Sequence, residues 1–539
     1  MNPYLLRIVV AILLCARLAS GEDDALSRID GWPGLLILSG GRGIPDEVAA
    51  ALKDAIKDGG SLVLITEATS DPTTVAKTTA WLHEHAFSDY VTIDSTLSDN
   101  ERRLATIAAI NKASAVWIGG GQQAKLAKSF GDGGVEAALQ RLLLRGGTVG
   151  SVSAGSAMMS KVMIESGTDE PKLANGWDLL PGAIIDQHFS ERGRMTRLQI
   201  AVERHPECFG MGVDEMTGVF VKGRAIRIVG KGSVSILLAK SEHRGLEVQR
   251  LMAGDSADLT QLHRAARQRT LQIDPGEPRY GSPDVHSGSV VIVGGGAMPE
   301  DVVARFVQLA GGEKANIVVL PTAGSREETS RQVPGFLKKE NLAGVTVLAQ
   351  RGQHEVATEE FRAALKAATG IWFGGGRQWN FVDSYEGTEA VELFRDVLRR
   401  GGVIGGSSAG ATIQGEFLVR GHPLGNIVMM AEGYERGFAF LPGTAIDQHF
   451  SQRNRQPDLL PVIRRHPKML GIGIDEGTAI VVKGTTVEVI GQHSAHFVSV
   501  KQLAKISIDQ LLPTAAEEAA KLYVSVKTGE SLDLRTIAE

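Results

Sequence analysis

The sequence predicts an α/β protein with two tandem domains, each a doubly wound sandwich around a mostly parallel sheet. Short apolar runs rich in β-branched residues, such as 61–66, alternate with amphipathic helical stretches, such as 46–60. Apolar strands separated by helices are typical of a parallel sheet that helices cover on both faces. The same order of motifs also occurs twice along the 539 residues, which indicates a duplicated domain.

Five pairs of similar segments define the duplication. They are 35–45 with 290–299, 116–123 with 371–378, 146–160 with 401–415, 179–194 with 440–455, and 210–223 with 471–484. We therefore expect a first domain over 30–250 and a second over 288–503. The polar segment 252–287, rich in Gly, Pro and Asp, predicts a linker. The tail 504–539 contains a helix-like stretch that we expect to pack on the second domain.

The first residues, 1–21, have the pattern of a secretory signal peptide: Arg7, an apolar core over 8–16 and small residues before a polar run. The pattern predicts export to the periplasm or the extracellular space, with no membrane attachment once the segment is removed. A lipidated Cys15 is the alternative, which the preceding leucine disfavours. Removal of the segment would leave Cys208 as the only cysteine, so we expect no internal disulfide.

Composition excludes some functions. Apolar residues make up 43% of the chain and charged residues 22%, as in ordinary globular proteins. A net charge of −5 gives no basic field, so we expect no nucleic-acid partner. No cluster of His, Cys and Asp has the spacing of metal ligands, and we predict no metal and no cofactor.

Ser153 and Ser408 each follow a buried strand and precede a helical run, between small residues. A serine on a sharp strand-to-helix turn projects its hydroxyl at the top of the sheet, and the N–H groups that follow can bind an oxyanion. The pattern predicts a nucleophile elbow. The second copy fits G-x-S-x-G in full, whereas the first has Ser151 in place of the leading glycine. A plain glycine-rich turn that binds phosphate is the alternative.

A serine nucleophile needs a base, and the base needs an orienting acid. His188 and His449 follow apolar stretches in both copies, and each is followed 27 residues later by a glutamate, Glu215 or Glu476. The adjacent aspartates are equally placed as candidates for the acid: Asp214 and Asp475. The order serine, histidine, acid argues against an α/β-hydrolase fold, whose order is serine, acid, histidine.

Two further features recur beside these candidates. Paired arginines follow each histidine, and guanidinium groups bind carboxylates bidentately. These arginines are Arg192 and Arg194 in the first copy, and Arg453 and Arg455 in the second. Glycine triplets at 119–121 and 374–376 offer N–H donors for an oxyanion, and the glutamines that follow offer an amide for substrate: Gln123 and Gln378.

Together, these motifs resemble the cyanophycinase and dipeptidase E family of serine peptidases, and the resemblance covers most of both halves. It implies a flavodoxin-like fold akin to the class I glutamine amidotransferases, with serine replacing their cysteine. It also implies hydrolysis beside aspartyl residues. Cyanophycinases hydrolyse a poly-aspartate polymer with arginine branches and release β-Asp-Arg dipeptides.

The resemblance implies a role for each matching residue. Catalytic roles fall on Ser153, His188 and Glu215, and on Ser408, His449 and Glu476. The oxyanion donors are expected at Gly121, Ala154, Gly376 and Ala409. Substrate-binding roles fall on Gln123, Asp186, Gln187, Arg192, Arg194, Gln378, Asp447, Gln448, Arg453 and Arg455. The chain departs from the family at Ser151 and Ser156 in the first elbow, and at Asp458, which stands where the first half has Arg197.

The sequence thus predicts an exported serine hydrolase that acts on an acidic peptide or an Asp-Arg polymer. Two alternatives stay open: a duplicated protein that binds acidic ligands with vestigial triads, and an aspartyl dipeptidase similar to dipeptidase E. The two domains could pair within the chain, or the chain could form homo-oligomers.

Overall fold

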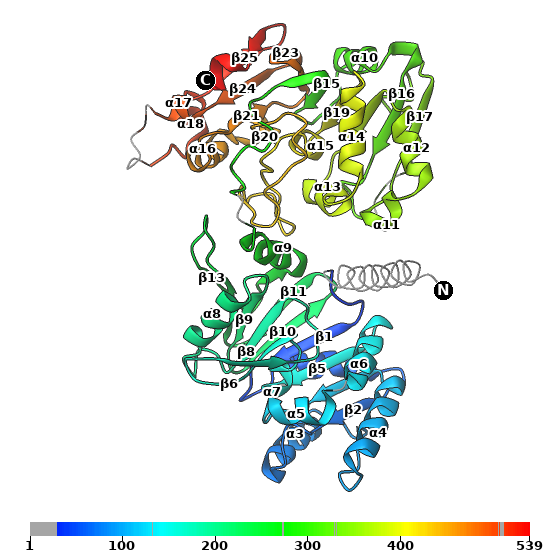
Figure 1. Cartoon of the computed structure of the whole chain (residues 1–539), viewed down its shortest axis with the longest axis vertical. Coiled ribbons are helices and arrows are strands. Elements are labelled where there is room, and N and C mark those ends of the chain that lie inside the picture. Colours follow the sequence, from blue (N-terminus) through cyan, green and yellow to red (C-terminus); the bar gives the residue numbers. More distant parts are fainter. Residues whose placement is uncertain are drawn as a thin grey trace, which may run out of the picture. The chain divides into compact units, whose positions relative to one another are not determined.

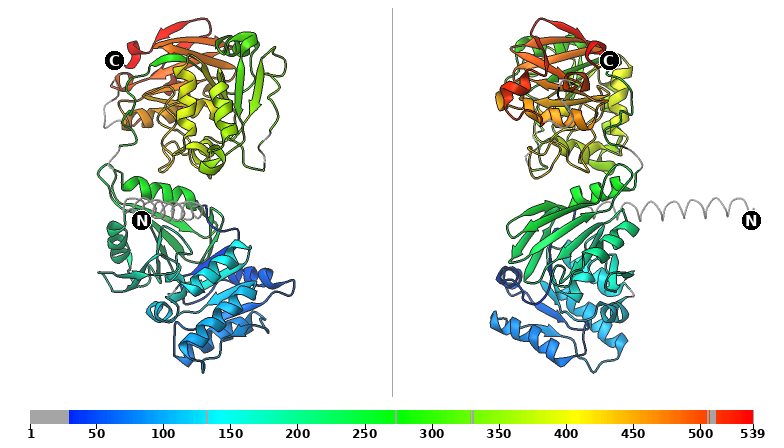
Figure 2. Two further views of the ribbon diagram at one scale, coloured as in Figure 1. Left: turned by 45° about the vertical axis from the view of Figure 1, so that its right-hand side comes forward. Right: turned by 90° about the vertical axis from the view of Figure 1, so that its left-hand side faces the viewer.

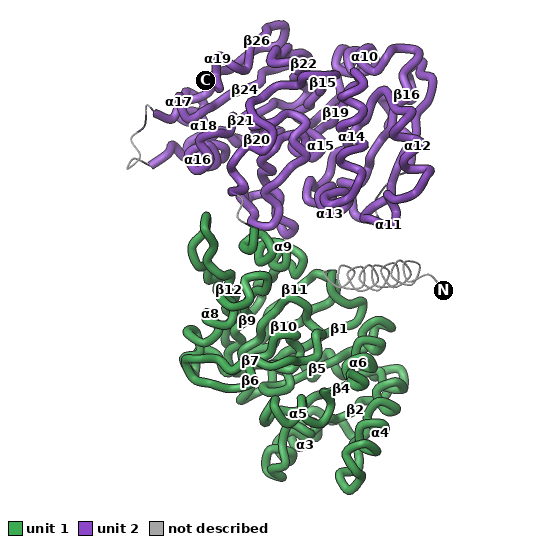
Figure 3. The backbone as a smooth tube through the Cα atoms, viewed as in Figure 1, with its two compact units in different colours: residues 1–272 green, residues 273–539 purple. Residues whose placement is uncertain are grey.

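The computed structural model describes residues 30–131, 133–271, 274–327, 329, 331–504, 506 and 511–538. The signal peptide predicted at 1–21 lies outside the described residues. The chain divides into two compact units, Met1–Gln272 and Ile273–Glu539 (Figures 1 and 3).

Unit 1 is built on an eight-stranded sheet in the order β14-β11-β10-β1-β5-β4-β2-β3. Its parallel strands are β1 (Leu35–Ser39), β2 (Leu62–Ile65), β3 (Val91–Thr92), β4 (Ala115–Ile118) and β5 (Thr148–Val152). The antiparallel strands are β10 (Thr217–Lys222), β11 (Ala225–Gly230) and β14 (Ser256–Asp258).

A second sheet of unit 1 has the order β13-β12-β9-β8. The strands of this sheet are β8 (Ala183–Gln187), β9 (Phe209–Val213), β12 (Ser233–Leu238) and β13 (Glu247–Met252). In addition, β6 (Val162–Ser166) pairs with β7 (Lys172–Asn175). The helices of unit 1 are α2 (Asp46–Ile56), α3 (Pro72–Glu84), α4 (Asp99–Lys112), α5 (Gln123–Phe130), α6 (Gly134–Leu144), α7 (Ala154–Ala157), α8 (Met195–Arg204) and α9 (Leu259–Arg269).

Helices cover both faces of the main sheet of unit 1 (Figure 2). Along β1, Leu36 and Leu38 pack in the cluster that includes α4, α5 and α6, whereas Ile37 packs with α2 and α3 on the other face. Because successive side chains of a strand point to opposite faces, a continuously apolar strand supplies both layers of core. The doubly wound fold predicted from the sequence is confirmed.

Unit 2 repeats this plan with sheets β17-β16-β18-β19-β15-β22-β23-β26 and β20-β21-β24-β25. The strands of the larger sheet are β15 (Val285–Val293), β16 (Asn316–Leu320), β17 (Gly344–Val347), β18 (Gly370–Phe373), β19 (Val403–Ser407), β22 (Thr478–Gly484), β23 (Thr486–Gly491) and β26 (Ser531–Asp533). Those of the smaller sheet are β20 (Thr444–Gln448), β21 (Leu470–Ile474), β24 (Ser494–Val498) and β25 (Val524–Lys527).

In chain order, the helices and 3₁₀ turns of unit 2 are α10 (Glu300–Leu309), the 3₁₀ turn η1 (Gly312–Lys314), α11 (Gly352–Val356), α12 (Glu359–Ala367), α13 (Gln378–Tyr385), α14 (Ala390–Arg399), α15 (Ala409–Thr412), the 3₁₀ turn η2 (Ser451–Arg453), α16 (Gln456–Arg465), α17 (Val500–Leu503), α18 (Ala516–Ala520) and α19 (Arg535–Ala538). Within the described residues, no helix combines the length and apolar character needed to cross a bilayer.

The domain boundaries differ from those expected. Residues 256–269, within the segment expected to be a linker, form β14 and α9 of unit 1, and α9 buries Leu259 and Leu262. In unit 2 the tail supplies the equivalent edge strands, β25 and β26, the buried Leu534, and the helix α19, which buries Ile537. The segment 254–259 and the segment 529–534 share the pattern G-x-S-x-D-L, a sixth matching pair. The polar composition of 252–287 favours a linker because short edge strands carry few apolar residues, whereas the tail packs on the second unit as expected.

The folded state of this segment predicts the effect of a core substitution. Leu259→Ala should lower the free energy of unfolding of unit 1 by about 2–5 kcal/mol, because it empties a fully buried position. Leu271→Ala, at a half-exposed position, is the control and should change it by less than about 0.5 kcal/mol. Urea unfolding measures both. Equal stabilities of the two variants would show that 252–271 does not belong to the folded unit.

Candidate active site

Ser153 and Ser408 occupy the same strained turn in the two units. Ser153 lies between β5 and α7, and Ser408 between β19 and α15. Their backbone angles are φ 54°, ψ −113° and φ 57°, ψ −113°, a conformation that side-chain-bearing residues rarely adopt. Such strain persists only where the surrounding structure imposes it, and it is a feature of a nucleophile elbow.

The two serines that depart from the family pattern fit the first elbow. The Ser151 hydroxyl donates to the Ile37 carbonyl at 3.0 Å, and the Ser156 hydroxyl donates to the Ser39 carbonyl at 2.9 Å. The two hydroxyl oxygens are 3.1 Å apart. Each buried hydroxyl therefore has a partner, and the turn keeps the geometry found in unit 2.

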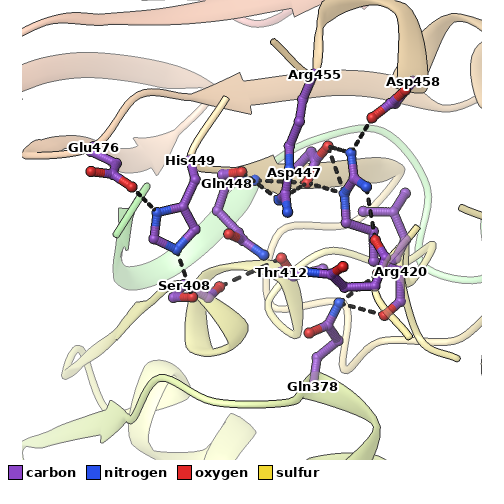
Figure 4. Close-up of polar contacts among 12 residues, drawn as sticks. Gln378, Ser408, Thr412, Arg420, Asp447, Gln448, His449, Arg455, Asp458 and Glu476 are labelled. Carbon is purple, nitrogen blue, oxygen red and sulfur yellow. Dashed lines mark hydrogen bonds and ion pairs between the residues drawn. The ribbon is translucent and has the colours of Figure 1, made fainter. Parts of the chain in front are cut away.

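Each serine lies within hydrogen-bond distance of a histidine. The Ser153 Oγ is 2.9 Å from His188 Nε2, and the Ser408 Oγ is 3.0 Å from His449 Nε2 (Figure 4). Both histidines follow the last residue of a strand of the smaller sheet, β8 or β20. The serine thus comes from the main sheet of its unit and the histidine from the second sheet.

The second ring nitrogen of each histidine contacts a glutamate. His188 Nδ1 is 2.7 Å from Glu215 Oε1, and His449 Nδ1 is 2.5 Å from Glu476 Oε1. The adjacent aspartates have other partners, because Asp214 accepts the Ser190 N–H at 3.0 Å and Asp475 accepts the Ser451 N–H at 3.0 Å. The structure therefore brings glutamate, and not aspartate, to the imidazole in both units.

A glycine in the loop after β1 or β15 covers each imidazole. A Cβ atom on Gly41 would lie 2.1 Å from His188 Cε1, and one on Gly295 would lie 2.3 Å from His449 Cε1. No side chain fits there. The sequence pattern gave no sign that these glycines belong to the site, although the first pair of matching segments, 35–45 and 290–299, contains them.

Burial sets the protonation of both histidines. It lowers the pKa of His188 and of His449 below the usual 6.5, and the hydrogen bond that each imidazole donates to its partner glutamate opposes this effect. The positive charges of Arg192 and Arg453 lower the pKa of the neighbouring histidine further. At neutral pH each imidazole is therefore uncharged and can accept a proton from the serine.

Several residues expected to bind substrate are committed to contacts inside the protein. Asp186 and Asp447 are buried and form ion pairs with Arg194 and Arg455, at 3.1 Å in both units. These four side chains, expected to bind substrate, are thus paired with one another within each unit. Arg192 and Arg453 are exposed.

The glutamines expected to bind substrate contact the backbone of the segment that follows the elbow helix. Gln123 Nε2 donates to the Ile164 carbonyl at 2.9 Å, and Gln378 Nε2 donates to the Val419 carbonyl at 2.9 Å. Gln187 Oε1 accepts a hydrogen bond from Arg194 at 2.6 Å, while Gln448 is buried close to Arg455.

The buried aspartate close to each histidine in the sequence pairs with an arginine that comes from a different segment in each unit. In unit 1, Arg197 of α8 pairs with Asp186, its Nε 2.6 Å from Oδ2. Asp458 stands at that position in unit 2, and Arg420, from the loop after α15, takes over: its Nη2 is 2.8 Å from Asp447 Oδ2 and 2.5 Å from Asp458 Oδ2 (Figure 4). The reversed charge at Asp458 is thus compensated. Spacing could not predict it, because no equivalent of Arg420 exists in the first half.

Two of the four expected oxyanion donors, Ala154 and Ala409, directly follow the serines, whereas Gly121 and Gly376 pack elsewhere. Ala154 and Ala409 begin helices, so their N–H groups have no acceptor within the helix. In the glycine triplets, the middle residue is the one beside the serine: a Cβ on Gly120 would lie 3.2 Å from Ser153 Cβ. Gly121 and Gly376 instead pack against backbone, with their Cβ positions 2.3 Å from the Ala68 carbonyl oxygen and 2.6 Å from the Ala323 carbonyl oxygen.

In the part of the chain that the structure describes, no three His, Cys, Asp or Glu side chains are grouped to hold an ion. Burial raises the pKa of the Cys208 thiol to about 12, which keeps it protonated and unreactive.

The chain matches the model of one protein family. The model of peptidase family S51 matches residues 35–229 and 289–490, one region in each unit. A cyanophycinase of Geminocystis herdmanii (strain PCC 6308) is 33% identical over 217 residues, covering 38% of this chain and 78% of that protein. A cyanophycinase of Trichormus variabilis (strain ATCC 29413 / PCC 7937) is 30% identical over 235 residues, covering 41% and 77%.

Solved structures of peptidases are also similar to the chain. A peptidase from an acI-B1 Actinobacterium is 18% identical, with a TM-score of 0.35, and covers 42% of this chain and 98% of its own. A putative peptidase E protein from Listeria monocytogenes EGD-e is 19% identical, with a TM-score of 0.28, and covers 38% and 99%.

The arginine exchange predicts a rescue. Arg420→Met should destabilise unit 2 by about 3 kcal/mol, because it leaves the buried Asp447 poorly compensated. Adding Asp458→Arg restores the arrangement of unit 1, where Arg197 holds this place, and should recover at least half of the loss. Arg399→Met, in an exposed ion pair, is the control and should cost less than about 1 kcal/mol. Urea unfolding measures all three, and a double variant no more stable than Arg420→Met would contradict the exchange.

Proposed function

The chain belongs to peptidase family S51, and from this premise we propose that each unit hydrolyses peptide or isopeptide bonds at aspartyl residues through its serine, histidine and glutamate. The chain is a serine peptidase. One observation carries the assignment of the sites: in both units an imidazole lies between the strained serine and a glutamate, with the same pairs of atoms in contact.

The proposed reaction starts at the serine hydroxyl. His188 Nε2 takes the proton of Ser153 Oγ while the oxygen attacks the aspartyl carbonyl carbon, and Glu215 stabilises the imidazolium that forms. The N–H of Ala154 and an N–H of the glycine triplet would hold the oxyanion. The amine leaves with the proton from His188, and water attacks the acyl-enzyme in the same manner. Ser408, His449 and Glu476 act likewise in the second site.

The substrate is proposed to be an acidic peptide or an Asp-Arg polymer. Two observations support an acidic substrate: the curated relatives are named cyanophycinase, and one exposed arginine lies beside each histidine. The backbone N–H of Arg192 donates to the His188 carbonyl at 3.2 Å, and that of Arg453 donates to the His449 carbonyl at 3.1 Å. Each exposed guanidinium is therefore attached next to the histidine of its site, where it would bind a carboxylate of the substrate.

Turnover by serine variants tests this function. Ser153→Ala and Ser408→Ala should each abolish one site and leave the other, and the double variant should lose at least about 1,000-fold in kcat. Poly-aspartate with arginine branches and short aspartyl peptides are the substrates, and mass spectrometry identifies the products. Ser95→Ala, an exposed serine, is the control. A double variant that keeps turnover contradicts the proposal, and cleavage of dipeptides but not of polymer would indicate an aspartyl dipeptidase.

We also propose that the chain is exported. Arg7, the apolar stretch 8–16 and the small residues before Glu22 support this proposal. Expression in a bacterial host should give a mature protein that begins near Glu22 and is recovered outside the cytoplasm, as measured by intact mass and fractionation. Recovery of the uncleaved chain in the cytoplasm would contradict export.

A further inference from the structure

The two sites differ in a charged residue beside the triad carboxylate. In the first site, Arg42 lies in the loop after β1, and its Nε is 3.5 Å from Glu215 Oε1. The same oxygen accepts the hydrogen bond from His188 Nδ1. The corresponding residue of the second site is Gly296, so Glu476 has no equivalent cation at this position.

The backbone at Arg42 supports a role for its side chain. Arg42 has a φ of 43°, and Gly296 has a φ of 72°. Glycine adopts this left-handed region freely, whereas a residue with a Cβ adopts it at an energetic cost. An arginine kept in a strained conformation next to a functional group indicates a functional contribution from that side chain. A Cβ on Gly296 would lie 2.9 Å from the Glu476 Cβ, so this position faces the triad acid in both units.

A second difference lies on the backbone side of the same glutamate. In the first site both carboxylate oxygens of Glu191 accept the N–H of Glu215, each at 3.2 Å. In the second site the amide oxygen of Gln452 accepts the N–H of Glu476 at 2.9 Å. Both side chains fix the peptide of the triad acid, but only Glu191 adds a negative charge.

The two differences have opposite electrostatic effects. A second carboxylate near His188 favours the imidazolium form of this histidine. A guanidinium on Glu215 does the reverse. The first site therefore has two added charges of opposite sign, and the second site has neither.

We propose that Arg42 and Glu191 are a matched pair of positioning residues, in which Glu191 fixes the backbone of the triad acid and Arg42 offsets the charge that Glu191 brings. Gly296 and Gln452 achieve the same result in the second site without charges. The inference deepens the proposed function and rests on it for the role of Glu215 as the triad acid.

Other charged groups act on the two histidines and are unchanged by the test. They are Glu215, Arg192 and Arg194 in the first site, matched by Glu476, Arg453 and Arg455 in the second. The neighbouring aspartates, Asp214 and Asp475, have different charged partners: Arg250 Nη2 is 3.9 Å from Asp214 Oδ2, and His496 Nε2 is 3.2 Å from Asp475 Oδ2.

Titration of the histidine itself tests the pair. The full chain with ¹³C-labelled histidine is titrated by NMR, and the His188 signal is assigned from its absence in His188→Gln. Arg42→Gln removes a cation and should raise the pKa of His188 by about half a pH unit. Glu191→Gln removes an anion and should lower it by a similar amount. The double variant should return to within about 0.2 units of the parent, since the two shifts cancel.

Two variants separate charge from other effects. Arg42→Lys keeps the cation and should leave the pKa of His188 close to that of the parent. In the second site, Gln452→Glu adds a carboxylate that no arginine opposes, and it should raise the pKa of His449 by about half a unit. Both Arg42 and Glu191 are exposed, so we expect the variants to fold.

The histidine pKa values are measured without substrate. Opposite shifts of the two single variants, with cancellation in the double, support the matched pair. Shifts in one direction, no shift, or a double variant that differs from the parent as much as a single one would overturn it. Because the titration needs no turnover, loss of the proposed hydrolysis in the Ser408→Ala protein would reject the function of the first site and still leave the charge pairing measured.

Discussion

The contact between a buried, uncharged imidazole and a strained serine is the interaction on which each unit depends. Ser153 comes from the end of a strand in the main sheet, whereas His188 and Glu215 follow strands of the smaller sheet. Bringing them within hydrogen-bond distance requires the two sheets to meet at the ends of these strands. The loop after β1 then has to cross the imidazole, and only glycine at position 41 allows that approach.

The duplication shows which features of this arrangement are fixed and which are replaceable. The atoms in contact at serine, histidine and glutamate are the same in both units. The surrounding charges are not: Arg420 replaces Arg197 from a different segment of the chain. A buried carboxylate such as Asp447 demands a cation, but the physical requirement does not specify which element supplies it. The units therefore have a common geometry and separate electrostatic solutions.

Much of the fold and the core of the site could be predicted because the relevant signals occur twice. The alternation of apolar strands with helices predicted the sheets. The constant interval of 27 residues between histidine and glutamate predicted that the two side chains meet. The choice between Glu215 and Asp214 needed the structure, since adjacent residues at the end of a strand point in different directions. The sequence assigned Asp186 and Arg194 separately to substrate, because the pattern does not show that the two side chains pair with each other. Polar edge strands, such as β14, carry too few apolar residues to be recognised.

The buried Cys208 gives unit 1 an internal reporter. Its thiol lies among Leu198, Val202 and Phe189, between α8 and the smaller sheet that carries His188. A thiol kept protonated by burial reacts with alkylating reagents only when the surrounding segment opens. The rate of its modification therefore measures the local opening of the layer that holds His188. Unit 2 contains no cysteine, so the signal belongs to the first unit alone.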